Sequence, residues 1–184
     1  MKISEIPFAD EALRNAVVAT GFENAEDVLE LRARKLGIGS TQGIEYLTQL
    51  KLLDLTRNRI EDIDLSANTE LEELFLGNNQ LSSFDVSSNL KLRHLELFMN
   101  DVEALDISKN TALESLLVRS NYRAELDITH NPELEELMLA DNNISHLNID
   151  NNPNLLRLNV EGNKLPDAVV ASLQKVDKFQ RLKL

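Results

Sequence analysis

Leucines recur along most of this chain with a period of 21 residues, and the positions between them repeat as well. We number the slots of each copy from its first leucine, at Leu50, Leu71, Leu92, Leu113, Leu134 and Leu155. Slots four and six are apolar in every copy, which is the period-two spacing of a strand with one buried face. A unit this short cannot bury its apolar face alone, so we expect the copies to stack and their strands to form one parallel sheet.

Two further slots contain asparagine in every copy. Slot nine holds Asn58, Asn79, Asn100, Asn121, Asn142 and Asn163, and slot nineteen holds Asn68, Asn89, Asn110, Asn131 and Asn152. An amide side chain carries both donors and an acceptor, so it can bond the turns of its own coil and of the next one. We therefore interpret both columns as structural rather than as ligand sites.

Residues outside the repeat predict a cap at each end of the stack. Residues 9–20 have their apolar side chains on one side of a helix, with Asp10 and Glu11 in its first turn and Gly21 at its end. Beyond Leu165 a helix opening at Pro166 is followed by an alternating segment that suits an edge strand. We predict one domain, residues 1–184, made of an N-terminal cap (1–27), repeats (28–165) and a C-terminal cap (166–184).

The motif L-x-x-L-x-L-x-x-N-x-L, with trailing segments such as FDVSSN (84–89) and LDISKN (105–110), resembles the short leucine-rich repeats of bacteria. It is similar to the internalin-type proteins and to the 21-residue arrays common in Bacteroidetes, and the likeness covers residues 28–165. The resemblance implies an α/β fold: a right-handed solenoid, or horseshoe, with a parallel concave sheet and short helical caps at both ends. It also implies that the concave sheet binds another macromolecule, usually a protein, although fold alone does not fix function.

Composition narrows the choice of partner. A formal net charge of −12 at pH 7 argues against nucleic acid and anionic membrane surfaces, and it favours basic partners. There is no cysteine and no apolar run long enough to span a membrane, and we expect no cofactor. Residues 1–10 include Glu5, Pro7 and Asp10, which do not suit a secretory leader. As written, the chain is expected to be cytoplasmic; the alternative is a secreted or surface protein whose leader has been removed.

The outward-facing slots of the sheet contain the candidate binding residues. Slot five reads Asp54, Phe75, Glu96, Leu117, Met138 and Asn159. Apolar groups gathered in a charged surface usually mark an interface. We predict a partner-binding face made of Phe75, Phe98, Met99, Leu117, Met138, Glu73, Glu96, Arg119 and Tyr122. Its acidic border favours a protein with apolar anchors flanked by lysine or arginine.

Other interpretations of this face remain open. A cap or loop can cover the apolar side chains, or they can mediate self-association in a structural or adhesion module. In the fourth copy, slot eleven holds Arg123 instead of an apolar residue. We expect either a local bulge there or a rim in which Tyr122 and Arg123 contact the partner.

An enzyme is the distant alternative to a binding protein. Glu73, His94 and Ser115 occupy slot three of successive copies, in the order acid, base and nucleophile. A flat sheet supplies neither an oxyanion hole nor a substrate pocket, so we expect no enzyme and keep a serine or metal-dependent hydrolase only as a remote possibility. Slot fifteen stacks Asp64, Asp85, Asp106 and Asp127. Such a ladder can bind calcium, but the serine or threonine two residues later favours turn capping.

Overall fold

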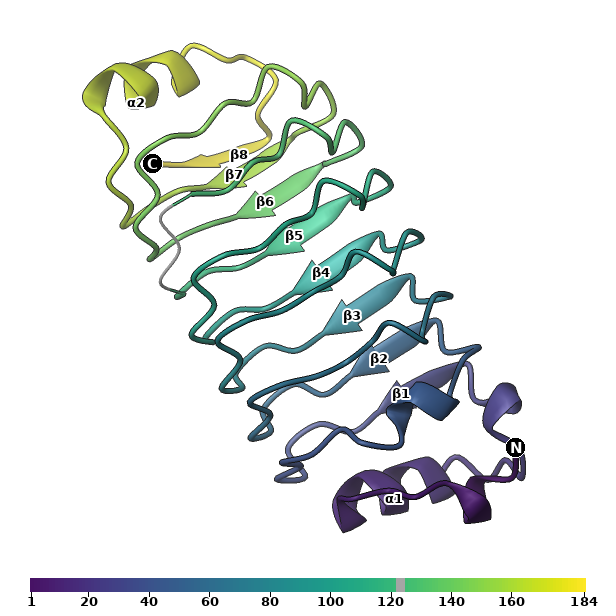
Figure 1. Ribbon diagram of the computed structural model, residues 1–184. Coiled ribbons are helices and arrows are strands. Elements are labelled where there is room, and N and C mark those ends of the chain that lie inside the picture. The colour runs from purple at the N-terminus through teal and green to yellow at the C-terminus, as the bar shows by residue number, and fades with distance from the viewer. Residues whose placement is uncertain (122–124) are drawn as a thin grey trace.

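The molecule is a stack of coils whose strands form one sheet (Figure 1). The computed structural model describes residues 1–121 and 125–184. Eight strands of three residues pair in parallel and in chain order. They are β1 (Glu30–Arg32), β2 (Leu52–Asp54), β3 (Glu73–Phe75), β4 (His94–Glu96), β5 (Ser115–Leu117), β6 (Glu136–Met138), β7 (Arg157–Asn159) and β8 (Arg181–Lys183). The predicted leucine-rich solenoid with a parallel sheet is confirmed.

Residues one repeat apart lie side by side in the sheet. Leu74 pairs with Leu53 in the preceding strand and with Leu95 in the following one. These leucines are completely buried, whereas the residues on either side of Leu74 in β3 are exposed or half-buried. Slot four therefore forms a continuous row inside the core, and slots three and five face outward from the sheet.

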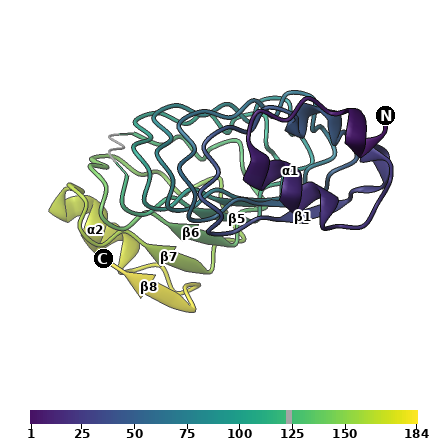
Figure 2. The ribbon, with the colours of Figure 1, turned by 90° about the horizontal axis from the view of Figure 1, so that it is seen from below.

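The return side of the coils closes the core without regular helices. Figure 2 shows the strands along one side of the stack and the irregular return segments along the other. Among the described residues between 28 and 165, the return segments contain turns and one short 3₁₀ helix, Ile44–Tyr46. Ile60 and Leu65 are representative of the buried residues on this side. A coil of 21 residues leaves too few for a regular helix there.

The slot-nine asparagines join each coil to the one before it. In Asn100, Oδ1 accepts a hydrogen bond from the backbone N–H of Leu81 (3.1 Å). Its Nδ2 donates to the carbonyl oxygens of Leu76 and Leu97, both at 3.0 Å. One side chain thus satisfies three buried backbone groups in two coils, which agrees with the structural interpretation.

The slot-nineteen asparagines use their donors in the same way. Nδ2 of Asn110 donates to the carbonyl oxygens of Val86 (3.0 Å) and Asn89 (2.9 Å). Its buried Oδ1, however, has no hydrogen-bond partner among the described residues, and the other four members of the column share this property. The two columns therefore differ in how completely their amides are satisfied.

Slot eight turns the chain three residues after the end of each of the strands β1 to β7. Every residue in this column has a positive φ, between 53° and 68°. The residues are Lys35, Arg57, Asn78, Met99, Ser120, Asp141 and Gly162. Glycine and asparagine accept this left-handed conformation most readily, so lysine, arginine and methionine occupy it at a cost in stability.

Asp10 ties the N-terminal cap to the first repeat. Its Oδ1 accepts hydrogen bonds from the backbone N–H groups of Ala12 (2.8 Å) and Leu13 (3.0 Å) at the start of α1 (Glu11–Val18). Its Oδ2 accepts from the N–H of Gly39 (2.9 Å) in the first coil. Burial acts to raise the pKa of Asp10, but these backbone donors outweigh it and hold the pKa below its usual range.

Helical segments lie at both ends of the stack, near the positions that the sequence predicts. Helix α1 is two residues shorter at each end than the predicted residues 9–20, because Asp10 stays extended as its N-cap and Gly21 turns the chain with φ 80°. At the other end, α2 (Asp167–Leu173) buries Leu173, and β8 adds the last strand. In the described part of the chain, no helix has the length and apolar character needed to cross a membrane.

Candidate functional site

The slot-five side chain differs between the ends of the stack and its middle. Asp54 Oδ1 accepts from the backbone N–H of Thr56 (3.1 Å), and Asn159 Oδ1 accepts from that of Glu161 (3.0 Å). The four coils between them carry Phe75, Glu96, Leu117 and Met138 at this slot. Phenylalanine and leucine have no acceptor for this N–H, and methionine has only a weak one. In the middle of the sheet, three of the four slot-five side chains therefore contribute little to the turn.

Phe98 packs against a glycine of the preceding coil. A Cβ atom added to Gly77 would lie 2.3 Å from the nearest ring carbon of Phe98, so only glycine leaves room for the ring in this position. The guanidinium carbon of Arg119, in the next coil, lies 5.1 Å from the ring centroid. Slot seven thus places the Phe98 ring against a glycine and beneath a cation, with part of the ring still accessible.

Three more apolar members of the predicted face are half-buried rather than fully exposed. Phe75, Leu117 and Met138 lie on the outward side of β3, β5 and β6. The Phe75 ring is tilted by 47° against the ring of His94, with centroids 6.2 Å apart. Together with Phe98, we call these side chains the apolar stripe: Phe75, Phe98, Leu117 and Met138.

Glu96 interrupts the apolar stripe with a carboxyl group. Partial burial, followed by the neighbouring negative charge of Asp54, raises its pKa above the usual range. Arg34, Arg119 and His94 offset part of this effect. Glu96 therefore keeps its proton to a higher pH than an ordinary glutamate does.

A cleft opens at the β1–β2 end of the stripe. Its volume is about 490 Å³, and it is lined by Arg34, Lys35, Thr56, Arg57, Glu96 and Phe98. Nε of Arg34 forms an ion pair with Asp54, whose side chain is only 1% exposed. Lys35 and Arg57 form no ion pair with any described residue. The cleft is thus a local cationic site on an acidic protein.

The acidic border lies at the opposite, amino-terminal ends of the strands and is partly neutralised within the chain. Ion pairs between successive coils join Lys51 to Glu72 (3.1 Å), Arg93 to Glu114 (2.7 Å) and Arg157 to Glu136 (3.1 Å). Glu73 and Glu135 form no ion pair with a described residue. The free negative charge of this border is therefore smaller than the sequence indicates.

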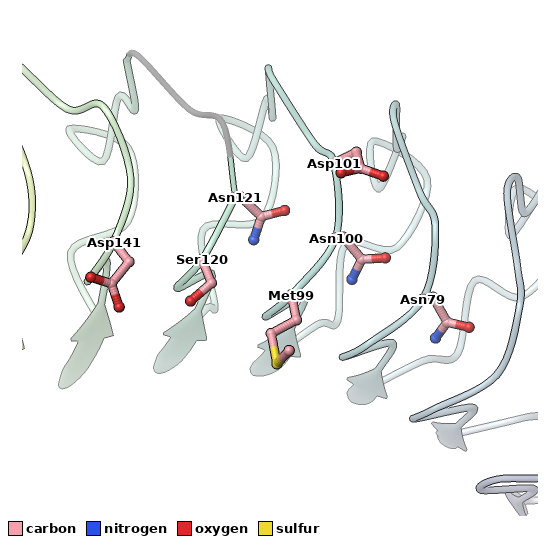
Figure 3. A pocket seen from close by; sticks show the side chains of 7 residues that line it. All are labelled: Asn79, Met99, Asn100, Asp101, Ser120, Asn121 and Asp141. Atoms are coloured by element: carbon pink, nitrogen blue, oxygen red, sulfur yellow. The ribbon is translucent and has the colours of Figure 1, made fainter.

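Met99 lies beside the sheet face rather than on it. It occupies the left-handed turn of slot eight and is 51% exposed. Figure 3 shows it in a pocket of about 390 Å³ with Asn79, Asn100, Asp101, Ser120, Asn121 and Asp141. The three asparagines of this pocket belong to slot nine, where their amides already bond the backbone. The asparagine amides of this pocket are therefore already committed to the backbone.

The residues of the hydrolase alternative lie at successive register positions, but the hydroxyl of Ser115 is directed elsewhere. Glu73 pairs with His94, and His94 with Ser115, in the sheet register. Ser115 is 3% exposed, and its Oγ donates to Glu136 Oε2 at 3.3 Å. Within residues 1–121 and 125–184, no three His, Asp or Glu side chains are grouped so that they could hold one metal ion.

The aspartate column of slot fifteen caps turns, which is the interpretation that the sequence favoured. Asp64, Asp85 and Asp106 each accept a hydrogen bond from the backbone N–H two residues later, at 2.8 to 2.9 Å. Asp127 does the same with Thr129 at 2.9 Å. Hydrogen bonds from the hydroxyl and backbone N–H of Ser66 lower the pKa of Asp64. Each carboxylate is thus committed to its own turn.

Sequence reasoning placed the stripe correctly on the outward face but missed the cleft and the packing of Phe98. The basic residues of the first coil were visible as a local change of charge, yet their convergence with Arg57 required the structure. Gly77, the one glycine in its column, was the available signal for a close approach. Tyr122 and Arg123, candidates for the rim, lie outside the described residues.

Comparison with known proteins gives the same family signal as the repeat. A family model described as "Leucine Rich repeats (2 copies)" matches residues 48–91. A comparison with curated proteins found no match.

Solved structures from bacteria have the same architecture. Internalin C2 of Listeria monocytogenes is 26% identical, with a TM-score of 0.71, and the match covers 100% of this chain and 97% of that one. The functional domain of InlJ from the same species is 25% identical (TM-score 0.61; 90% of this chain and 48% of that one). A leucine-rich-repeat protein of Leptospira interrogans is 24% identical (TM-score 0.62; 76% and 44%).

These matches differ from the chain in extent and in detail. The chain spans about half of the InlJ and Leptospira chains that it matches. The InlJ domain includes a cysteine ladder, whereas this chain has no cysteine and stacks asparagines in its coils. The repeat, the parallel sheet and the matches agree on one conclusion: the chain has the leucine-rich-repeat fold and is similar to the internalin-type proteins of bacteria.

Proposed function

We propose that this protein is a non-enzymatic binding module that holds another protein against the outward face of its sheet. The leucine-rich-repeat fold itself favours protein interaction. The observation that carries the proposal is the change of slot five along the stack. Polar Asp54 and Asn159 serve the turns at its two ends, whereas Phe75, Leu117 and Met138 between them do not.

The composition of the stripe supports a role as anchor. Aromatic and methionine side chains are enriched where protein interfaces bury their centres. The Phe98 ring is held between Gly77 and Arg119, so a partner that covers it has little side-chain ordering left to impose. In the coils of Phe75, Leu117 and Met138, the backbone N–H two residues later lacks the slot-five acceptor that Thr56 and Glu161 have, so a partner carbonyl can take its place.

The charge of the acidic border favours a partner with basic side chains. Glu73 and Glu135 form no ion pair with a described residue and lie at the amino-terminal ends of β3 and β6. A partner with apolar anchors flanked by lysine or arginine fits this arrangement. The half-buried Glu96 within the stripe adds an acceptor for a hydrogen bond.

Affinity capture with a double variant tests the proposal. Phe75→Ala with Phe98→Ala should abolish capture of the partner while leaving thermal stability nearly unchanged, because both rings lie on the surface. Phe22→Ala, which removes a 49% exposed ring outside the sheet, is the matched control and should capture normally. By comparison, Leu95→Ala removes a fully buried side chain and should cost about 2–5 kcal/mol.

Two results would contradict the proposal. If the double variant loses as much stability as Leu95→Ala, its rings belong to the core and not to a binding face. If it captures the same proteins as the wild type, the stripe is not the site. Sedimentation of the pure protein addresses self-association through this face: a monomer at all concentrations removes a structural or adhesion role based on self-assembly.

A further inference from the structure

The cleft beside Phe98 differs in charge from the rest of the protein. The chain has a net charge of −12, yet four cations, Arg34, Lys35, Arg57 and Arg119, gather at the cleft and around Phe98. Among the described residues that line the cleft or pair with its cations, two carry carboxyl groups, Asp54 and Glu96. The cations are in excess at this one place, so its local potential has the opposite sign to the average surface.

Two of the four cations are free to meet a ligand. Arg34 is engaged by the buried Asp54, and Arg119 lies over the Phe98 ring. Lys35 and Arg57 are exposed, and neither forms an ion pair with a described residue. Both line the cleft together with Phe98, so the cleft presents cationic groups next to an aromatic ring.

The backbone gives a second argument for Lys35 and Arg57. Both sit in slot eight, with φ of 58° and 62°. Other coils place Asn78 and Gly162 in this slot, and these residue types adopt the left-handed conformation at less cost. The turn itself therefore does not require a cation in either coil. Long basic side chains at strained positions beside a cleft are more consistent with recognition than with folding.

We infer that the cleft binds a carboxylate side chain of the partner protein, presented next to an apolar residue that packs on Phe98. Arg57 and Lys35 would donate charge-assisted hydrogen bonds to the carboxylate, and Thr56 forms the adjacent wall. This inference rests on the proposed function and adds to it the orientation in which the partner lies on the sheet. The partner would place its basic residues over the amino-terminal ends of the strands and an acidic residue over the cleft.

Peptide titration followed by NMR tests this inference directly. The probe is a short acetylated and amidated peptide with a central leucine and two glutamates on each side of it. We expect saturable shifts of Arg57, Thr56 and Phe98 resonances at millimolar peptide. The same peptide with glutamine in place of glutamate should bind at least about tenfold more weakly.

Variants of matched charge separate the cleft from the overall field. Lys35→Gln with Arg57→Gln should weaken the glutamate peptide at least about tenfold. Lys51→Gln with Arg93→Gln makes the same change in net charge at the opposite ends of the strands and should weaken binding no more than about twofold. Both variants replace exposed side chains, so their thermal unfolding should stay close to that of the wild type.

Three results would overturn the inference: equal binding of the glutamate and glutamine peptides, equal losses in the two double variants, or no shift of the cleft resonances. These outcomes are distinct from a failure of the proposed function. That failure would appear as normal partner capture by the Phe75→Ala, Phe98→Ala variant, and it would leave the peptide result at the cleft unchanged.

Discussion

Replacing Gly77 by alanine tests whether Phe98 is a surface anchor or a core residue. The added Cβ would lie 2.3, 2.5 and 2.7 Å from three ring carbons of Phe98, whereas ordinary van der Waals contact begins at 3.4 Å. The ring must therefore retreat by about 1 Å or rotate away from its position. The φ of Gly77 is not in the left-handed region, so the backbone accepts alanine without strain.

The expected change in stability is small because its components oppose one another. Displacing the ring weakens its contact with Arg119, which is worth about 0.5–1 kcal/mol at an exposed site. Alanine restricts the unfolded chain more than glycine does and returns about 0.4–1 kcal/mol. We expect a net change within about 1 kcal/mol, which is a shift of the melting temperature of no more than about 2–4 °C for a domain of this size.

The assay combines thermal unfolding with NMR of the Phe98 ring. In the wild type, ring protons should show close contacts with the α-protons of Gly77, and these contacts should disappear in Gly77→Ala. Partner capture should fall as it does for Phe98→Ala. Ala140→Gly is the control, since Ala140 fills the same slot of a coil further along. A loss of stability equal to that of Leu95→Ala, or a ring that stays over residue 77, would refute this account of the ring.

Three further predictions concern the scaffold. Asn100→Ala leaves three buried backbone groups unpaired and should cost about 3 kcal/mol in urea unfolding, whereas Asn110→Ala should cost about 1 kcal/mol less, because it also removes an unpaired buried oxygen. Asp10→Asn should lower stability by about 1 kcal/mol at neutral pH, because the amide has only one acceptor oxygen and loses the hydrogen bond from Gly39. Since the folded pKa of Asp10 is lowered, the carboxylate stabilises above its unfolded pKa, and the difference from the wild type should vanish as the pH falls through the folded value. Met99→Asn should raise stability by up to about 1 kcal/mol by relieving the left-handed turn, and Asn78→Met should have the opposite effect.

The row structure of the sheet could be predicted because a fixed period translates directly into register. Leu74, Leu95 and Leu116 lie side by side and inward, as the 21-residue spacing requires. The period also predicted that Phe75 faces outward from the sheet. In a solenoid, one coil of sequence therefore specifies most of the fold.

The degree to which each outward side chain is covered could not be predicted from the columns. Asp54 shares slot five with Phe75 but is 1% exposed, because it bonds Thr56 and pairs with Arg34 from another coil. Phe98 is half-buried because slot seven of the preceding coil happens to be glycine. Such effects depend on pairs of neighbouring side chains, whereas a column describes one position at a time.

The asparagine columns have a consequence for how the molecule comes apart. Slot-nine amides such as Asn58 and Asn100 bond their own coil and the adjacent one, and the bonds to the adjacent coil have sequence separations of 19 to 25 residues. These hydrogen bonds therefore stabilise each coil only through its immediate neighbours in the stack. Amide hydrogen exchange should be slowest in the central coils and quicken toward both ends, so that the molecule frays from its termini while the middle of the sheet stays closed.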